Sequence, residues 1–178
     1  MLNKIAELVQ SQGHCVLATC GEGEGGVAPH ASLMAYCPAP DCLEFWLASP
    51  RATRKMRNLA ANPVASLLMD DRSGDRSGDR SGDVSGDVSD RGPDDACGAG
   101  PSRALTVAVR AVPFDSARHE SLARAALLAR HPGLAGFLAD DGVAVVRLVA
   151  VSFQLLSGLS EVFFVEAEKM LDARSRRA

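Results

Sequence analysis

Hydrophobic residues recur along the chain with two different periods, and each period predicts a different kind of element. Over residues 2–12 they recur at helical spacing, which predicts an amphipathic helix that Gly13 ends (Leu2, Ile5, Leu8 and Val9). Residues 14–20 alternate with period two and predict a first strand, followed by a glycine-rich turn at 21–26. Two further alternating runs, 28–37 and 42–49, flank the turn Pro38-Ala39-Pro40-Asp41 and predict a β-hairpin.

A cluster of hydroxyl and cationic side chains follows the hairpin, where a strand gives way to a short helix. Asn62-Pro63 ends this helix, because a proline disfavours helical geometry in the residue before it, and an apolar run at 64–69 predicts the next strand. The start of a helix attracts anions through its free N–H groups and its dipole. The cluster at this start favours a phosphate site, and a solvated basic face is the alternative (Ser49, Thr53, Arg54, Lys55 and Arg57).

The second half of the chain predicts a strand, two helices and further strands. An alternating run at 104–112 predicts the strand, and Asp115-Ser116 predicts the cap of a helix that extends to about residue 130. We expect its buried stripe to contain Leu122, Ala126 and Leu127 or Leu128. A short helix is predicted at 133–139. The β-branched run 143–157 predicts one long bent strand or two strands, and a last strand at 162–165 precedes a terminal helix at 166–177.

Residues 71–90 consist of a four-residue repeat, DRSG changing to DVSG, and a similar acidic composition continues to about residue 102. Such a segment buries too little apolar surface to offset the entropy of ordering it. We therefore predict a disordered insert at about 71–102 within a single domain that spans residues 1–178. Short consecutive strands with few helices indicate a mainly β (α+β) fold, with an antiparallel closed sheet and helices at its ends.

Charge and composition argue against several functions. The net charge is −3 and no basic face stands out over the whole chain, so nucleic acid is not expected as a partner. No apolar run reaches the roughly twenty residues of a membrane-spanning helix. The first residues lack a signal-peptide core, so we expect a cytoplasmic protein. The odd number of cysteines fits free thiols (Cys15, Cys20, Cys37, Cys42 and Cys97). The first four form two Cys-x4-Cys pairs, whose spacing is wider than that of zinc knuckles, so no metal site is expected.

The ordered set of motifs in the first part of the chain resembles the pyridoxamine 5'-phosphate oxidase-like flavoproteins. The matching motifs are Leu17-Ala18-Thr19, Pro29-His30-Ala31-Ser32, Leu47-Ala48-Ser49, Thr53-Arg54-Lys55, Asn58-Leu59 and Asn62-Pro63. The resemblance implies an FMN-binding split β-barrel, usually a homodimer with FMN across the interface. It implies that the FMN phosphate meets Arg54, Lys55, Ser49 and Thr53. It also implies that the flavin ring runs along the strand containing Ser32, Leu33 and Met34, with His30 beside it.

These implications predict an FMN-dependent oxidoreductase that acts on a small molecule by hydride transfer at flavin N5, without an assigned general base. Two differences separate the chain from pyridoxamine 5'-phosphate oxidase itself. Ser32 stands where the oxidase has a phosphate-binding arginine. The chain also has a single tryptophan, Trp46, and lacks the arginine and tryptophan groups of the oxidase's last strand. Oxidation of pyridoxamine phosphate is therefore not expected.

The second half resembles the haem-degrading branch of the same superfamily, through Arg130-His131-Pro132, Gly136-Phe137, Asp140 or Asp141, Arg147-Leu148 and Leu156-Ser157-Gly158. That branch uses a histidine in its C-terminal extension for haem, and no histidine follows His131 here. His131 fits the end of a helix before a proline better than it fits a ligand role. A non-catalytic flavin- or haem-binding protein for storage, sensing or haem utilisation is the alternative function. A cofactor-free interaction module is a third.

Overall fold

The computed structural model describes residues 2–71, 102–158 and 160–170. Its helices are α1 (Leu2–Ser11), α2 (Arg54–Ala61), α3 (Ala117–Arg130) and α4 (Ala135–Leu138), with a 3-10 turn, η1 (Pro132–Leu134), between the last two. Its strands are β1 (His14–Gly23), β2 (Gly26–Pro38), β3 (Glu44–Pro50), β4 (Val64–Asp70), β5 (Arg103–Val112), β6 (Val143–Ser157) and β7 (Glu161–Glu166). The order of these elements agrees with the order that the sequence predicts.

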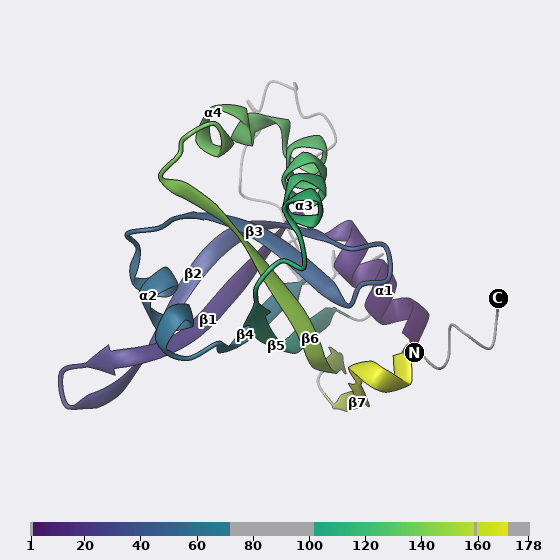
Figure 1. Ribbon diagram of the computed structural model, residues 1–178. Coiled ribbons are helices and arrows are strands. Elements are labelled where there is room, and N and C mark those ends of the chain that lie inside the picture. Colours follow the sequence, from purple (N-terminus) through teal and green to yellow (C-terminus); the bar gives the residue numbers. More distant parts are fainter. Residues whose placement is uncertain (1, 72–101, 159, 171–178) are drawn as a thin grey trace, which may run out of the picture.

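The strands form one antiparallel sheet that closes on itself (Figure 1). Within the described residues their order is β3-β2-β1-β4-β5-β6-β7, and a further pairing of β3 with β6 closes a barrel. The long strand β6 allows this closure, because its residues 143–149 pair with β3 and its residues 152–157 pair with β7, while β5 occupies the opposite edge. The predicted fold, a mainly β split barrel with peripheral helices, is confirmed.

The glycine-rich segment predicted as a turn at 21–26 is mostly β-structure. β1 and β2 stay paired until Gly23 faces Gly26, so that only Glu24 and Gly25 form the turn. Gly25 and Gly26 have φ angles of 86° and 124°, in the region that glycine adopts at no steric cost. The first strand is therefore longer than the predicted 14–20, and the hairpin projects beyond the barrel (Figure 1).

Helix α3 begins where the sequence predicts, and of its predicted buried stripe Leu127 is confirmed and Ala126 is partly buried. The Ser116 hydroxyl accepts a hydrogen bond from the His119 backbone N–H at 3.1 Å, as an N-cap residue does. Ala123 and Leu127 are fully buried, whereas Leu122 keeps 59% of its surface exposed. The prediction that Leu122 belongs to the buried stripe is therefore wrong. The side that carries Ala123 and Leu127 packs on the barrel, and Leu122 points about 100° away from Ala123.

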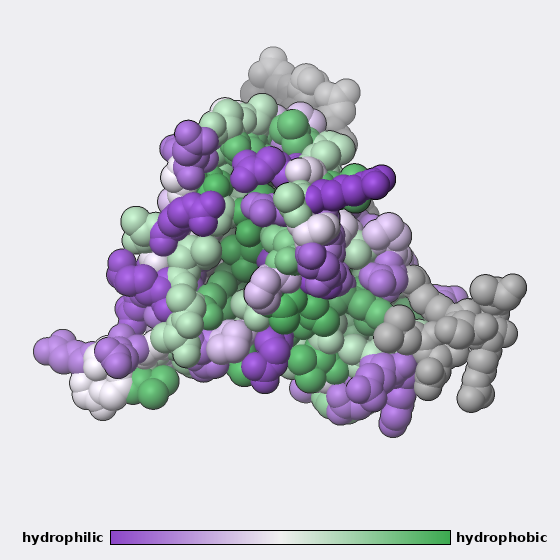
Figure 2. All heavy atoms as spheres, viewed as in Figure 1, coloured by the Kyte–Doolittle hydropathy of each residue, from purple (hydrophilic) through white to green (hydrophobic). Residues whose placement is uncertain are grey.

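Two hydrophobic clusters hold the barrel and its helices together. Side chains from α1 and the strands fill the barrel, and Tyr36 is fully buried there with its hydroxyl donating to the Val9 carbonyl at 2.6 Å. A second cluster packs α3 against β3 and contains Trp46, Ala123 and Leu127. β3 is thus buried on both faces, and Tyr36 and Trp46 are core residues. On the side of the molecule seen in Figure 2, hydrophobic residues gather in the middle, below α3 and α4.

The two ends of the predicted insert are neighbours in the sheet. Asp70 pairs with Ala104, and the Asp71 carboxylate accepts hydrogen bonds from the backbone N–H and the Nε of Arg103. Residues 72–101 lie outside the described residues, so the disorder expected at about 71–102 stays a prediction. The expected terminal helix at 166–177 is described only at residues 167–170, which are helical.

Candidate functional site

The sheet opens between β2 and β3, and a pocket occupies the opening. The two strands are paired from Pro38 and Phe45, next to the turn that joins them, as far as Tyr36 and Leu47, and the pairing ends there. Beyond that pair a pocket of about 220 Å³, which we call the split pocket, lies between residues 33–35 and 48–50. On their opposite edges these segments pair with β1 and β6, and on the pocket side no strand of the described residues pairs with them. The lining consists of Leu33, Met34, Ala35, Ala48, Ser49, Pro50, Lys55, Leu134 and Phe137.

Two of the predicted hydroxyl groups meet at the junction between β3 and α2. The Ser49 and Thr53 hydroxyl oxygens are 3.1 Å apart, and Thr53 Oγ1 donates to the Pro50 carbonyl at 3.0 Å. Thr53 is the N-cap residue of α2, but its side chain makes no hydrogen bond to the first amides of the helix. The Thr53 side chain therefore leaves those amides to another acceptor, as an anion site at this junction requires.

The two predicted cationic ligands diverge. Lys55 is partly buried and lines the split pocket. Arg54 is exposed, and its Nη2 lies beside the β1–β2 hairpin, 3.6 Å from the position that a Cβ on Gly23 would take. Lys55 is therefore the cation that the structure brings to the pocket. One turn further along α2, the buried residues Asn58 and Leu59 attach the helix to the barrel and fix which side Lys55 faces.

His30 and Ser32 lie farther along β2, toward the hairpin. Ser32 Oγ is 3.2 Å from His30 Nε2, and the His30 carbonyl accepts a hydrogen bond from Thr19 Oγ1 at 3.4 Å. Neither side chain belongs to the pocket lining. The predicted residues that the split pocket brings together are Leu33, Met34, Ser49 and Lys55, and those outside its lining are His30, Ser32, Thr53 and Arg54.

One wall of the split pocket was not predicted. Leu134 of η1 and Phe137 of α4 line it, although they follow β3 by more than eighty residues in the sequence. They reach the pocket because α3 packs on β3 and because Arg124 of α3 donates a hydrogen bond to the Leu138 carbonyl of α4. The motif Gly136-Phe137, noted for its resemblance to haem-degrading proteins, was the only sequence signal for this wall.

Comparison with known proteins identifies the family. A family model described as pyridoxamine 5'-phosphate oxidase matches residues 1–112, which is more than half of the chain. The chain belongs to the pyridoxamine 5'-phosphate oxidase family. No curated protein matches it.

Solved structures share the fold of this pyridoxamine 5'-phosphate oxidase family member. A haem-binding protein from Mycobacterium smegmatis has a TM-score of 0.68 at 18% identity, over 96% of this chain and 60% of that chain. HutZ, a haem storage protein from Vibrio cholerae, has a TM-score of 0.52 at 18% identity, over 90% of this chain and 92% of that chain. A Clostridium acetobutylicum protein related to general stress protein 26 has a TM-score of 0.57 at 16% identity, over 95% and 96%. The family thus has flavin- or haem-binding members.

In this family member His131 ends a helix, as the sequence predicts. It is the C-cap of α3, and its Nε2 lies 2.8 Å from the Tyr36 carbonyl oxygen. This contact uses one ring nitrogen to attach the end of α3 to β2. The neighbouring Arg130 Nη2 donates to the carbonyls of Gln10 and Gln12 at 2.7 and 2.8 Å, which attaches the same end to α1.

Cys15, Cys20 and Cys37 are free thiols. Cys15, Cys37 and Cys42 are buried and Cys20 is exposed. Burial raises the pKa of the Cys15 thiol to about 12. Within the described ranges, no three His, Cys, Asp or Glu side chains are grouped to hold a metal ion. No helix in the same ranges combines the length and apolar character needed to cross a membrane.

Proposed function

We propose that the split pocket binds FMN and that the protein is an FMN-dependent oxidoreductase acting on a small molecule. The observation that carries this proposal is the convergence of Lys55, Ser49 and two strand edges on one pocket with an apolar wall. A cation beside hydroxyl groups suits a phosphate, and an apolar wall beside free backbone groups suits a planar ring with a polar edge. Bound FMN would supply hydride transfer at its N5 atom, and the protein would supply position and charge.

Lys55 is the side chain that we assign to the FMN phosphate. Lys55 lines the pocket near the start of α2, where the first helix amides and the helix dipole also favour an anion. Ser49 and Thr53 stand at the same junction with their hydroxyl groups. A hydrogen bond to a charged group contributes about 1.5–3 kcal/mol, so Lys55→Gln should weaken FMN binding about 10- to 100-fold.

We further propose that a second copy of the chain completes the site. The pocket of about 220 Å³ is smaller than the roughly 300–1,000 Å³ of most small-molecule sites. Beside it, one row of paired residues crosses the outer face of the sheet from β2 to β7, namely Leu33, Val16, Leu68, Thr106, Gln154 and Phe164. Leu33, Leu68 and Phe164 expose 73%, 40% and 57% of their surface. A row of this length, with exposed apolar side chains at both ends and at Leu68 between them, fits a homodimer interface.

A non-catalytic flavin- or haem-binding protein is the second candidate. The names of the M. smegmatis protein and of HutZ favour haem for those proteins. In this chain His131 already places one ring nitrogen against the Tyr36 carbonyl, so a haem ligand would have to come from its Nδ1 atom or from another residue. We also propose a cytoplasmic location, which the free thiols of Cys15, Cys20 and Cys37 support.

The visible spectrum of the purified protein, with the released cofactor identified by chromatography, tests the proposal. Release of FMN from the wild type, together with weaker FMN binding by Lys55→Gln, supports the site. Reduction of the bound flavin by a nicotinamide or a substrate supports the enzyme. Arg57→Gln is the matched control, because it removes the same charge from an exposed position of α2. A haem band favours the second candidate. A colourless protein that takes up neither cofactor overturns both.

A further inference from the structure

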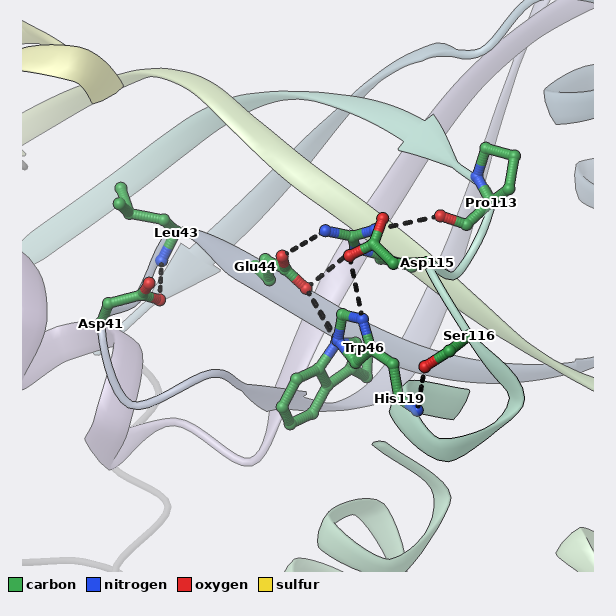
Figure 3. Close-up of polar contacts among 9 residues, drawn as sticks. Asp41, Leu43, Glu44, Trp46, Pro113, Asp115, Ser116 and His119 are labelled. Carbon is green, nitrogen blue, oxygen red and sulfur yellow. Dashed lines mark hydrogen bonds and ion pairs between the residues drawn. The ribbon is translucent and has the colours of Figure 1, made fainter. Parts of the chain in front are cut away.

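A charged cluster fastens α3 to the barrel on the side of β3 that α3 covers (Figure 3). Both oxygens of Glu44 on β3 accept hydrogen bonds from Arg147 on β6, from Nη2 at 2.6 Å and from Nε at 2.9 Å. Arg147 Nη1 also donates to Asp115 Oδ1, just before α3, at 2.7 Å. His119 in the first turn of α3 lies between the two carboxylates. Its Nε2 is 3.4 Å from Glu44 Oε2, and its Nδ1 is 3.3 Å from Asp115 Oδ2.

The surroundings hold the His119 ring in this position. The rings of Trp46 and Phe114 lie edge-on to it, with centroid distances of 6.2 and 5.2 Å. Its side chain is 23% exposed and that of Glu44 is 20% exposed, so their contact is partly shielded from water. The charged groups that face the ring within the described residues are Glu44, Asp115 and, through these carboxylates, Arg147.

Protonation of His119 balances the charge of this cluster. Two carboxylates and one guanidinium leave one negative charge when the ring is neutral, and none when the ring is protonated. A neutral imidazole has a single N–H and can donate toward one carboxylate, whereas an imidazolium has an N–H toward each. The hydrogen bond from Arg147 holds the pKa of Asp115 below its usual range, so this carboxylate stays charged where histidines titrate.

We propose that His119 is a proton-operated clamp, which binds Glu44 and Asp115 together when the ring is charged and thereby holds α3 on the barrel. The far end of α3 is attached through Arg130 and His131, so the clamp controls the near end of the helix. Because Arg124 links α3 to the Leu138 carbonyl of α4, the clamp also steadies Phe137 at the split pocket. This last consequence rests on the proposed function, whereas the clamp itself does not.

The clamp is tested by comparing thermal unfolding of the wild type and His119→Gln at pH 5.5 and pH 8. The charged ring can donate to both carboxylates and the neutral ring to only one, so we expect the clamp to contribute more stability at pH 5.5 than at pH 8. We expect the advantage of the wild type over His119→Gln in unfolding temperature to be about 2–4 °C larger at pH 5.5 than at pH 8. A difference that is equal at both pH values, or larger at pH 8, overturns the clamp.

Two further measurements separate the possible failures. Asp115→Asn, at an exposed carboxylate, removes one negative charge and should reduce the pH dependence of the wild type even if His119→Gln fails to fold. An unchanged pH dependence in this variant also counts against the clamp.

The ratio of FMN dissociation constants between His119→Gln and wild type should reach up to about fivefold at pH 5.5 and one at pH 8. The ratio cancels the titration of the FMN phosphate. A ratio of one throughout overturns the link to the pocket, and absence of FMN binding overturns the proposed function, while the unfolding comparison still decides the clamp.

Discussion

The Asn58 side-chain amide on α2 donates a hydrogen bond to the Thr19 hydroxyl on β1 across 3.0 Å. Both residues are buried, with 5% and 1% of their surface exposed. A Cβ on Gly21 would lie 2.0 Å from Asn58 Oδ1, so the missing side chain of Gly21 makes room for this contact. The contact attaches α2 to the barrel one turn after Lys55, and the position of Lys55 at the split pocket depends on it.

We expect Asn58→Ala to lower the free energy of unfolding by about 1–3 kcal/mol, because the buried Thr19 hydroxyl loses its donor. Gly21→Ala should also destabilise the protein, because the new methyl group displaces the Asn58 amide. Urea unfolding of the two single variants and the double variant checks the coupling. Gly21→Ala should cost less in the Asn58→Ala background than in the wild type. Strictly additive costs would show that the two residues do not share this contact.

Local patterns predicted the elements of this site better than they predicted its walls. Ser49, Lys55, Leu33 and Met34 lie on a predicted hairpin and helix, and they meet at the pocket because short turns connect their elements. Phe137 arrives through the packing of α3 on β3, and no periodicity in its own segment encodes that contact.

The same distinction explains the errors in the prediction. Barrel closure depends on pairs such as Ala48 with Val145, which local alternation does not specify. Leu122 was assigned to the buried stripe because the leucines and alanines of α3 lie on several of its sides, and packing on the barrel chose Ala123 and Leu127. Arg54 and Lys55 are adjacent in the sequence but point in different directions on a helix, so residue type alone could not tell which one reaches the pocket.

The burial of Cys15 predicts a difference in thiol reactivity. Burial raises the pKa of its thiol to about 12, whereas the pKa of a cysteine in an unfolded chain is about 8.5. The raised pKa adds stability that is complete below about pH 8.5 and declines as the pH rises toward 12. Iodoacetamide at pH 8.5 should therefore modify the exposed Cys20 and spare Cys15 until the chain unfolds. Peptide mass spectrometry with and without urea measures both sites, and equal modification of the two in the folded protein would contradict the burial of Cys15.

The bonded ends of β4 and β5 predict that residues 72–101 can be replaced by a short Gly-Ser linker. Asp70 already pairs with Ala104, and Arg103 Nε donates to Asp71 Oδ2 at 2.7 Å, so the linker joins two neighbouring points. Closing a shorter loop costs less entropy. We expect an unfolding temperature equal to or above that of the wild type and unchanged FMN content. Asp71→Asn in the shortened chain, which weakens the contact at the loop ends, is the matched control and should unfold earlier. A shortened chain that fails to fold would mean that the replaced residues contribute contacts of their own.

The row of paired residues that crosses the sheet from Leu33 to Phe164 predicts which surface substitution breaks the proposed homodimer. Leu68 lies in the middle of that row, between Val16 and Thr106, and 40% of its surface is exposed. Leu68→Asp would place a charge in the interface, where desolvation of an unpaired carboxylate is costly, so light scattering should show a monomer in place of a dimer. Leu122→Asp is the control, because Leu122 is more exposed and lies on α3, away from the row. Since each copy alone provides a small pocket, the monomer should also lose FMN while keeping its unfolding cooperative. A Leu68→Asp protein with the same mass and FMN content as Leu122→Asp would place the interface elsewhere on the molecule.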